Sequence, residues 1–289
     1  MTTTPALKLL ALSDLHVTAP TAGSYGLDTH ARLEAAMERI TGAYGDSDLL
    51  VLIGDVTDRG DPKSYFALKA ALDRLPIPYA VTLGNHDNRE AFATVFGTDH
   101  LDPNGFAQRA LDVEGHRVIL LDTLVEGPAA NGNWGHGHGH LCDLRLGWLR
   151  DRLDETDLPT IIAFHHPATP LGIQMDAMNL DNGGAFRAAL GAHRPRAILS
   201  GHVHMTTTTI WDGLTFHTLA GGHTSSTEAY GADGPDTKVR RTGPATMAVV
   251  LSDEMRTTIH LDAYVDAHNP VPDRATPAQL LPVRAGNSN

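Results

Sequence analysis

The sequence of 289 residues contains a single cysteine, Cys142, and only 6% aromatic residues. One cysteine excludes an internal disulfide bond and every zinc-binding module built from cysteine thiolates. Basic residues are also scarce, because 22 lysines and arginines stand against 34 acidic residues and leave a formal net charge of −12. So acidic a chain is not suited to coating nucleic acid or an anionic membrane, and we expect neither as a partner.

Long hydrophobic runs are missing as well, since no stretch approaches the roughly 20 apolar residues of a membrane-spanning helix. Residues 1–12 carry one basic residue and a short apolar run before Ser13 and Asp14, which is too short for a signal peptide. We therefore expect a soluble, cytoplasmic protein. The content of 42% hydrophobic and 19% charged residues is that of a globular chain, which excludes disorder as its overall state.

Short apolar runs alternate with stretches of helical periodicity through the first hundred residues, in the order βαβαβα. This order is typical of a mostly parallel sheet covered by helices. Strands are expected at residues 9–12, 49–53 and 79–83, and helices at 29–44, 64–75 and 89–96.

The second half consists mainly of expected strands and turns. Hairpins are expected around residues 114–116 and at Asp212-Gly213, a dipeptide that favours tight turns between strands. Further strands are expected at 160–164, 197–199, 246–251 and 257–261, with a helix near 146–153. These patterns predict two sheets with helices outside them, in a single domain over residues 1–268 that is followed by a proline-rich tail, 269–289.

Histidine is abundant, with 17 residues, and it is the commonest metal ligand among the side chains. Many of the histidines belong to five polar clusters, each of which directly follows an expected strand. The clusters are Asp14-Leu15-His16, Gly54-Asp55, Gly84-Asn85-His86-Asp87, His165-His166 and Gly201-His202-Val203-His204. Because the carboxyl ends of parallel strands meet at one edge of a sheet, we expect the clusters to converge on one site.

The candidate ligands among these side chains are oxygen and nitrogen donors without a thiolate: the two carboxylates of Asp14 and Asp55, the amide of Asn85 and up to five imidazoles. This set favours Mn, Fe, Zn or Co over Ca or Mg. It exceeds what one ion can bind, whereas two ions about 3.5–4 Å apart that share one carboxylate would use it fully. Any one cluster alone occurs by chance, but five in order, each directly after a strand, do not.

The order of the clusters resembles that of the calcineurin-like metallophosphoesterases, whose motifs D-x-H, G-D, G-N-H-[DE], H-[HP] and G-H-x-H appear here as SDLH, GDVTDRG, GNHD, FHHP and GHVH. Within that family the chain is most similar to bacterial class III cyclic nucleotide phosphodiesterases and glycerophosphodiesterases, through the LGWL stretch at 146–149 and the segment 170–183. The resemblance implies an α/β fold, a four-layer α/β/β/α sandwich of two mixed sheets flanked by helices.

The resemblance also implies two metal ions per chain and a set of ligands for each. The first ion would be bound by Asp14, His16, Asp55 and His204. The second would be bound by Asp55, Asn85, His165 and His202, with Asp55 as the bridge. His86 and Asp55 would be the catalytic residues, and His86 would contact the phosphoryl group of the substrate together with Asn85.

The implied activity is hydrolysis of small-molecule phosphodiesters, cyclic nucleotides or glycerophosphodiesters, by attack of a metal-bridging hydroxide. Two divalent ions, two carboxylates and one hydroxide leave a site charge of about +1, which suits a phosphodiester monoanion. His86 would hold the phosphoryl oxygens or protonate the leaving group. The terminal tail, and the oligomers that members of the resembled family often form, are compatible with a homo-oligomer, a dimer or higher.

Two other functions are alternatives. The first is a phosphomonoesterase, including a protein phosphatase, with the same metal site. Against it, the sequence offers only Arg59 and Arg89 as candidate partners of a phosphate dianion. The second is a non-catalytic binding scaffold, which usually loses metal ligands, whereas no ligand position is missing here.

Several further residues attract attention without entering the implied site. His136, His138 and His140 alternate with glycines, so we interpret the tract as a flexible loop in which the imidazoles are poorly preorganised for metal binding. His166 is expected behind the ligands or at the substrate rim, and His223 rather than His217 is expected to line the pocket. The sequence Asp58-Arg59-Gly60 either reflects the Ser/Thr phosphatase branch or caps a turn, and Cys142 is expected to have no chemical role.

Overall fold

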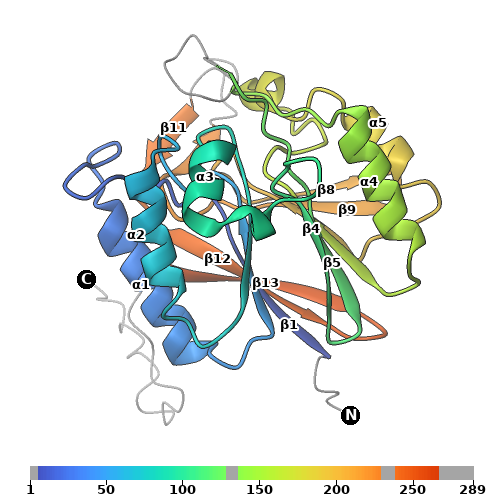
Figure 1. The fold of residues 1–289 in the computed structure, drawn as a ribbon, viewed down its shortest axis with the longest axis horizontal. Helices are drawn as coiled ribbons and strands as arrows, with labels where there is room; N and C mark the ends of the chain where they lie inside the picture. Colours follow the sequence, from blue (N-terminus) through green and yellow to red (C-terminus); the bar gives the residue numbers. More distant parts are fainter. Residues whose placement is uncertain (1–5, 128–135, 229–237, 267–289) are drawn as a thin grey trace, which may run out of the picture.

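The computed structural model describes residues 6–127, 136–228 and 238–266. Two mixed β-sheets lie face to face between two layers of helices (Figure 1). The predicted tail, 269–289, lies outside the described residues, and a single domain over 1–268 stays a prediction. None of the helices in the described part of the chain is long and apolar enough to cross a membrane.

The first sheet has five strands in the order β13-β12-β1-β2-β3. They are β1 (Leu7–Leu12), β2 (Leu49–Ile53), β3 (Tyr79–Thr82), β12 (Ala245–Ser252) and β13 (Thr257–Val265). The strands β1, β2 and β3 run parallel, and β12 joins β1 in the antiparallel sense. Three helices cover its outer face, α1 (Thr29–Ala43), α2 (Pro62–Leu72) and α3 (Arg89–Phe96) (Figure 1).

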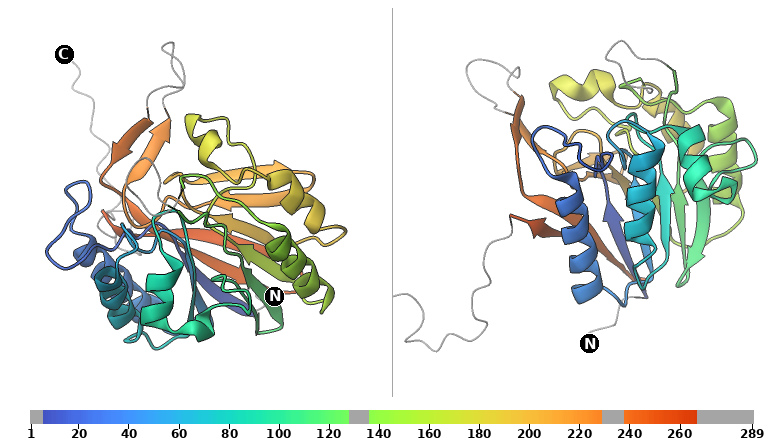
Figure 2. Two further views of the ribbon diagram at one scale, coloured as in Figure 1. Left: turned by 45° about the horizontal axis from the view of Figure 1, so that its top comes forward. Right: turned by 60° about the vertical axis from the view of Figure 1, so that its left-hand side comes forward.

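The second sheet has six strands in the order β4-β5-β6-β7-β9-β8. They are β4 (Arg109–Val113), β5 (His116–Leu120), β6 (Thr160–Ala163), β7 (Ala197–Ser200), β8 (Thr207–Trp211) and β9 (Leu214–Thr218). The helices α4 (Asp143–Asp154) and α5 (Gly183–Ala189) cover its outer face, and η1 (Thr98–His100) and η2 (Gln174–Met178) are short 3₁₀ turns. A separate ribbon, β10 (Ser225–Glu228) and β11 (Lys238–Arg241), rises at the upper end of the molecule (Figure 2).

Alternation of apolar side chains along the strands produces the layers. In β1, Leu10 and Leu12 pack toward the helices, whereas Leu9 and Ala11 pack between the two sheets. In β6, Ile162 instead packs in the layer under α4 and α5. Side chains of a strand point alternately to its two faces, so strands buried on both faces form three stacked core layers. The prediction of a four-layer α/β/β/α sandwich is thereby confirmed.

The elements that the sequence did not predict lack a periodic apolar pattern. Helix α5 begins with Gly183 and Gly184, residues of low helix propensity, and the sequences of β10 and β11 contain one apolar residue, Val239. The predicted helix at 64–75 ends earlier, at Leu72, and turn-type hydrogen bonds from Arg74 and Leu75 follow it. Tertiary contacts, and not local propensity, determine these parts.

A buried ion pair connects the first helical layer to the second sheet. Arg89, at the start of α3, donates from Nε to Asp122 Oδ2 at 2.6 Å and from Nη2 to Oδ1 at 2.8 Å, and Asp122 is fully buried beyond the end of β5. Burial raises the pKa of Asp122, but the charges of Arg89 and Arg145 outweigh it, so this pKa lies below its usual value. Arg89 is therefore engaged in the fold and is not a partner for a substrate phosphate.

We predict that Asp122→Asn lowers the free energy of unfolding by about 3–5 kcal/mol, because it removes the fully buried counterion that Arg89 and Arg145 share and leaves Arg89 only the more exposed Glu126. The matched control is Glu34→Gln, which breaks the exposed pair between Glu34 and Arg74. That variant should cost less than about 1 kcal/mol. Urea denaturation of both variants measures the difference, and equal losses would show that the buried pair does not connect the layers.

Candidate metal centre

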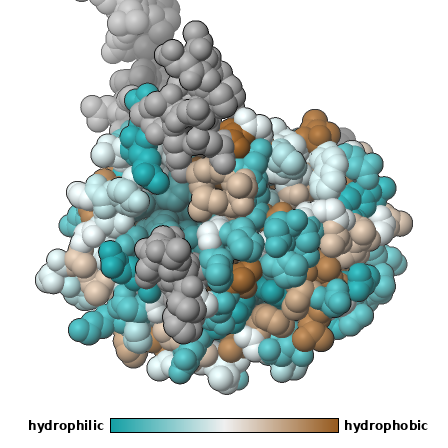
Figure 3. Space-filling view, turned by 90° about the horizontal axis from the view of Figure 1, so that it is seen from above, coloured by the Kyte–Doolittle hydropathy of each residue, from teal (hydrophilic) through white to brown (hydrophobic). Residues whose placement is uncertain are grey.

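The five polar clusters follow β1, β2, β3, β6 and β7 and meet at one end of the sandwich. Figure 3 looks onto this end, whose surface is mostly hydrophilic. The predicted ligands are buried there, and even the most accessible of them, His204, has a side chain only 12% exposed. The structure thus brings together the side chains that the motifs selected, from loops of both sheets.

The backbone at most of these residues is strained. A positive φ is uncommon outside glycine and costs of order 1–3 kcal/mol per residue, and such residues cluster at functional sites. The predicted ligands with positive φ are Asp14 (52°), His16 (45°), Asp55 (46°), His202 (72°) and His204 (55°). The surrounding loops therefore impose conformations on these residues that aim their side chains at one point.

Asp55 lies at the centre of the site. Its Oδ2 is 3.7 Å from Nε2 of His16 and 3.2 Å from Nε2 of His165. Its Oδ1 accepts the backbone N–H of His86 at 2.8 Å. Because His16 follows a strand of the first sheet and His165 a strand of the second, one carboxylate oxygen lies between imidazoles from both halves of the sandwich.

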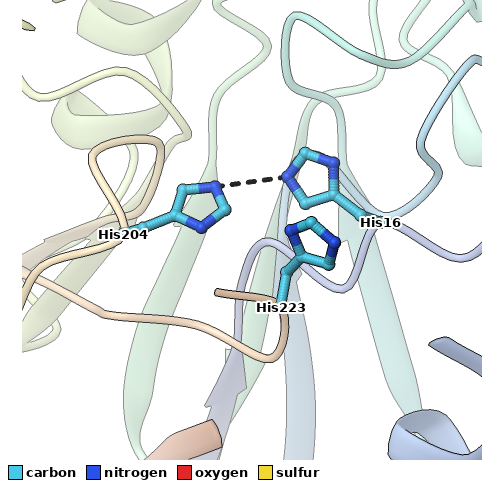
Figure 4. A group of neighbouring side chains, drawn as sticks. All are labelled: His16, His204 and His223. Atoms are coloured by element: carbon cyan, nitrogen blue, oxygen red, sulfur yellow. Dashed lines mark hydrogen bonds between the residues drawn. The ribbon is translucent and has the colours of Figure 1, made fainter. Parts of the chain in front are cut away.

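On one side of Asp55, two imidazoles face each other. Nε2 of His16 and Nε2 of His204 are 3.3 Å apart (Figure 4), and the latter is 3.4 Å from Asp14 Oδ1. The Nδ1 of His204 donates to the carbonyl of Thr224 at 2.7 Å, and the Nδ1 of His16 contacts Asp58 Oδ1 at 3.2 Å. These contacts place the proton on Nδ1, so both Nε2 atoms present lone pairs to the same space, as metal ligands do.

On the other side, His165 donates from Nδ1 to the carbonyl of Ile53 at 2.9 Å, which likewise leaves Nε2 as the donor atom for a ligand. Its ring lies 5.1 Å from that of His202. Asn85 Oδ1 is buried and accepts no hydrogen bond from any described residue. A buried oxygen without a donor is rare in proteins. With imidazoles and carboxylates around it, this oxygen fits a site for a divalent metal ion.

The charges at the site call for a cation. Burial raises the pKa of Asp14, and the neighbouring charge of Asp55 raises it further. Burial also favours the neutral form of Asp55, but the nearby imidazoles of His165 and His86 outweigh it and hold this pKa well below its usual range. Conversely, although burial opposes it, the charge of Asp55 raises the pKa of His165 to about 9. Two buried carboxylates so close together are stabilised by positive charge, which metal ions supply.

Two further histidines pack against the predicted ligands. His166 is fully buried, its ring lies 4.7 Å from that of His202, and its Nδ1 is 2.8 Å from Thr123 Oγ1. It therefore lies behind the ligands and not at the rim. The ring of His223 lies tilted 4.6 Å from that of His16 (Figure 4), and burial, together with the neighbouring His16, lowers the pKa of His223 to about 3.

Asp58 orients two residues of the site at once. Its carboxylate contacts Nδ1 of His16 and accepts the hydroxyl of Ser24 at 2.9 Å. Its backbone carbonyl accepts Nδ1 of His86 at 2.8 Å. The adjacent Arg59 has an 83% exposed side chain and does not line the cleft. The Asp58-Arg59-Gly60 sequence thus positions histidines and does not supply a phosphate-binding arginine.

The alternating His-Gly tract contacts the segment before α5 and the buried His166. Gly139 forms backbone hydrogen bonds with both Asn179 and Asp181, and a Cβ at position 139 would overlap the ring of His166. The imidazole of His140 contacts Asp181 at 2.7 Å, and that of His138 lies 3.9 Å from the same carboxylate. The glycine is needed for close packing behind the site, and the flexibility expected of this tract stays a prediction.

A cleft of about 100 Å³ opens onto these residues. Beyond the predicted ligands and His86 it is lined by Tyr25, Met175, Met178, His223, Thr224 and Arg240. The position of His223 agrees with its expected place in the pocket. Arg240 lies far from the five motifs in the sequence, and its one signal is that Arg240-Arg241 is the only adjacent pair of basic residues in this acidic chain.

Known proteins are similar to this chain in sequence and in fold. The model of the family described as Calcineurin-like phosphoesterase matches residues 7–206. A probable cyclic nucleotide phosphodiesterase of Rhodopseudomonas palustris is 33% identical over 219 residues, which cover 74% of this chain and 78% of that protein. A probable glycerophosphodiester phosphodiesterase of Arcobacter nitrofigilis is 30% identical over 218 residues, covering 73% and 77%.

The structural comparison agrees. A dimetal phosphatase from Danio rerio superimposes with a TM-score of 0.67 at 16% identity, over 90% of this chain and 97% of that one, which shows a common fold. The matched region contains all five motifs. The chain therefore belongs to the calcineurin-like phosphoesterase family.

Proposed function

We propose that this protein is a metal-dependent phosphodiesterase that hydrolyses small-molecule phosphodiesters, either cyclic nucleotides or glycerophosphodiesters. The position of Asp55 Oδ2, close to imidazoles from both sheets, carries the proposal, because it suits a carboxylate shared by two ions. One ion would be bound by Asp14, His16, Asp55 and His204. The other would be bound by Asp55, Asn85, His165 and His202.

Short contacts among the ligands support this division, since Nε2 of His204 lies 3.4 Å from Asp14 Oδ1 and 3.3 Å from Nε2 of His16. Two divalent ions so placed would lower the pKa of a water molecule and supply a hydroxide nucleophile at neutral pH. His86 is held by Asp58 through Nδ1, so its Nε2 is the atom that can carry a proton to a leaving group or hold a phosphoryl oxygen. The ring of His86 lies 4.5 Å from that of His16, next to the proposed metal ligands.

A phosphodiester fits the charges better than a phosphomonoester does. Arg89 is paired with Asp122 and Glu126, and Arg59 lies outside the cleft, so neither can bind a phosphate dianion. Arg240 is the one arginine that lines the cleft in the described part of the chain. A binding scaffold without activity is disfavoured because the candidate ligands are buried and assembled. Metal identity and a homo-oligomeric state stay predictions.

We expect the metal-loaded protein to hydrolyse bis(p-nitrophenyl) phosphate with a kcat/KM at least about tenfold above that for p-nitrophenyl phosphate, equivalent to about 1.4 kcal/mol of transition-state stabilisation. Both substrates release the same chromophore, so one assay compares them. Dialysis against a chelator should abolish both activities. A preference for the monoester would favour the phosphatase alternative instead.

Asp55→Asn should remove both metal ions, because the amide keeps the shape of the side chain but loses the charge that both ions share. His204→Ala, by comparison, should remove one ion and leave the other. Metal analysis of the purified variants measures this directly, and circular dichroism checks that both remain folded. Two tightly bound ions in Asp55→Asn would contradict the bridging assignment.

His86→Ala should retain both ions and lose activity according to the leaving group. A p-nitrophenolate departs without a proton, whereas an alkoxide needs one, so alkyl diesters should lose about 10- to 100-fold more activity than aryl diesters. Steady-state kinetics with bis(p-nitrophenyl) phosphate and a cyclic nucleotide compares the two. Equal losses would leave His86 with phosphoryl binding alone, and a loss of metal would make it a ligand.

A further inference from the structure

The cleft is smaller than a typical site for a small molecule. Its volume of about 100 Å³ falls below the roughly 300–1,000 Å³ of typical small-molecule sites. A phosphodiester group next to the proposed ligands would fill most of that space. We therefore expect the larger part of the substrate to contact the cleft-lining residues that belong to no metallophosphoesterase motif.

One of these residues, Tyr25, is held in a strained and exposed position. Its φ is 50°, which is an outlier for a bulky side chain, and the side chain is 68% exposed. The loop around it is fixed, because Leu27 donates a backbone hydrogen bond to Ser24 and the hydroxyl of Ser24 is bound to Asp58. The same Asp58 orients His16. The fold thus keeps an aromatic ring in solvent at a fixed place relative to the metal centre.

Arg240 of β11 lies over this ring, with its guanidinium carbon 4.9 Å from the ring centroid. It forms no ion pair with any residue that the structure describes, although the chain is strongly acidic. The ring centroids of Tyr25 and His223 are 5.8 Å apart in an edge-on arrangement, and the tilted rings of His223 and His16 have centroids 4.6 Å apart. A row of neighbouring planar side chains, His16, His223, Tyr25 and Arg240, therefore extends from a proposed metal ligand to the mouth of the cleft.

A second element supplies thioethers to the same cleft. Met175 and Met178 belong to η2, and Met178 is 37% exposed. The carboxylate of Asp176 accepts the backbone N–H groups of Leu171 and Gly172, which fixes this short helix. Thioether sulfurs pack favourably on aromatic rings. In Figure 2, this part of the chain lies at the same upper end as the β10–β11 ribbon.

We propose that Tyr25 and Arg240 bind the base of a nucleoside phosphodiester, and that they make the site selective for nucleotides over glycerophosphodiesters. This rests on the proposed phosphodiesterase function. A base has an aromatic face that can stack on Tyr25 or on the guanidinium of Arg240, and the thioethers can pack against it. A glycerol group offers no such face. Stacking of a base would cover the exposed ring of Tyr25 and place a second aromatic group beside the guanidinium of Arg240.

The test uses binding, which does not require turnover. Adenosine 5′-monophosphate, adenosine 3′-monophosphate and glycerol 3-phosphate are titrated by calorimetry into the metal-loaded wild-type, Tyr25→Ala, Tyr25→Phe and Phe66→Ala proteins. Phe66 is the matched control, an aromatic residue that is 58% exposed on α2 and lies outside the cleft. Hydrolysis of 3′,5′- and 2′,3′-cyclic AMP by the wild-type protein shows which linkage is the natural source of the nucleotide.

Tyr25→Ala should weaken the Kd for a nucleoside monophosphate by about 5- to 150-fold, the loss expected for one base–aromatic stack. The Kd for glycerol 3-phosphate should stay within about twofold, and Tyr25→Phe and Phe66→Ala should resemble the wild type. Equal weakening for both ligands, or none for the nucleotide, would overturn the inference. A wild-type protein that hydrolyses no diester, yet loses nucleotide binding in Tyr25→Ala, would instead refute the proposed function and leave the base-binding role intact.

Discussion

Loops from two sheets can build one site only where strands of both sheets end at the same side of the sandwich, and the carboxylate of Asp55 occupies that place. Asp55 follows β2 of the first sheet, while His165 follows β6 of the second, and a single oxygen of Asp55 lies 3.2 Å from the His165 ring nitrogen. The inner core between the sheets fixes their separation, and thereby the distance between these groups. The layered fold and the proposed dinuclear centre therefore depend on the same packing.

The strained backbone at the site requires support, and buried carboxylates provide much of it. Asp87 accepts hydrogen bonds from the backbone of Val56, Thr57 and Gly84 and from the hydroxyl of Tyr65, which ties the loops after β2 and β3 together. Burial, together with the charge of Asp55, raises the pKa of Asp87. Asp58 likewise supports the loop that carries His16, because its carboxylate contacts the imidazole of His16. Local strain at the ligands is thus offset by hydrogen bonds one layer further out, as is expected where function sets the conformation.

Sequence patterns predicted the sandwich because alternating apolar residues, such as Leu9 to Leu12, report burial on both faces of a strand. The candidate ligands were also predictable, since each directly follows such a strand. The mouth of the cleft was not. Tyr25 belongs to a loop with a positive φ, and Arg240 to a polar ribbon without alternation. Likewise, no local signal indicated that Gly139 packs against His166. These contacts arise from tertiary structure, and no short stretch of sequence contains both partners.

A crystal structure of the metal-loaded protein, with anomalous diffraction recorded above and below the absorption edge of the bound metal, tests the shared-carboxylate centre most directly. The account predicts two anomalous peaks about 3.5–4 Å apart, one beside His16 and His204 and the other beside His165, with Asp55 between them. A single peak, or two peaks of which only one contacts Asp55, would contradict it.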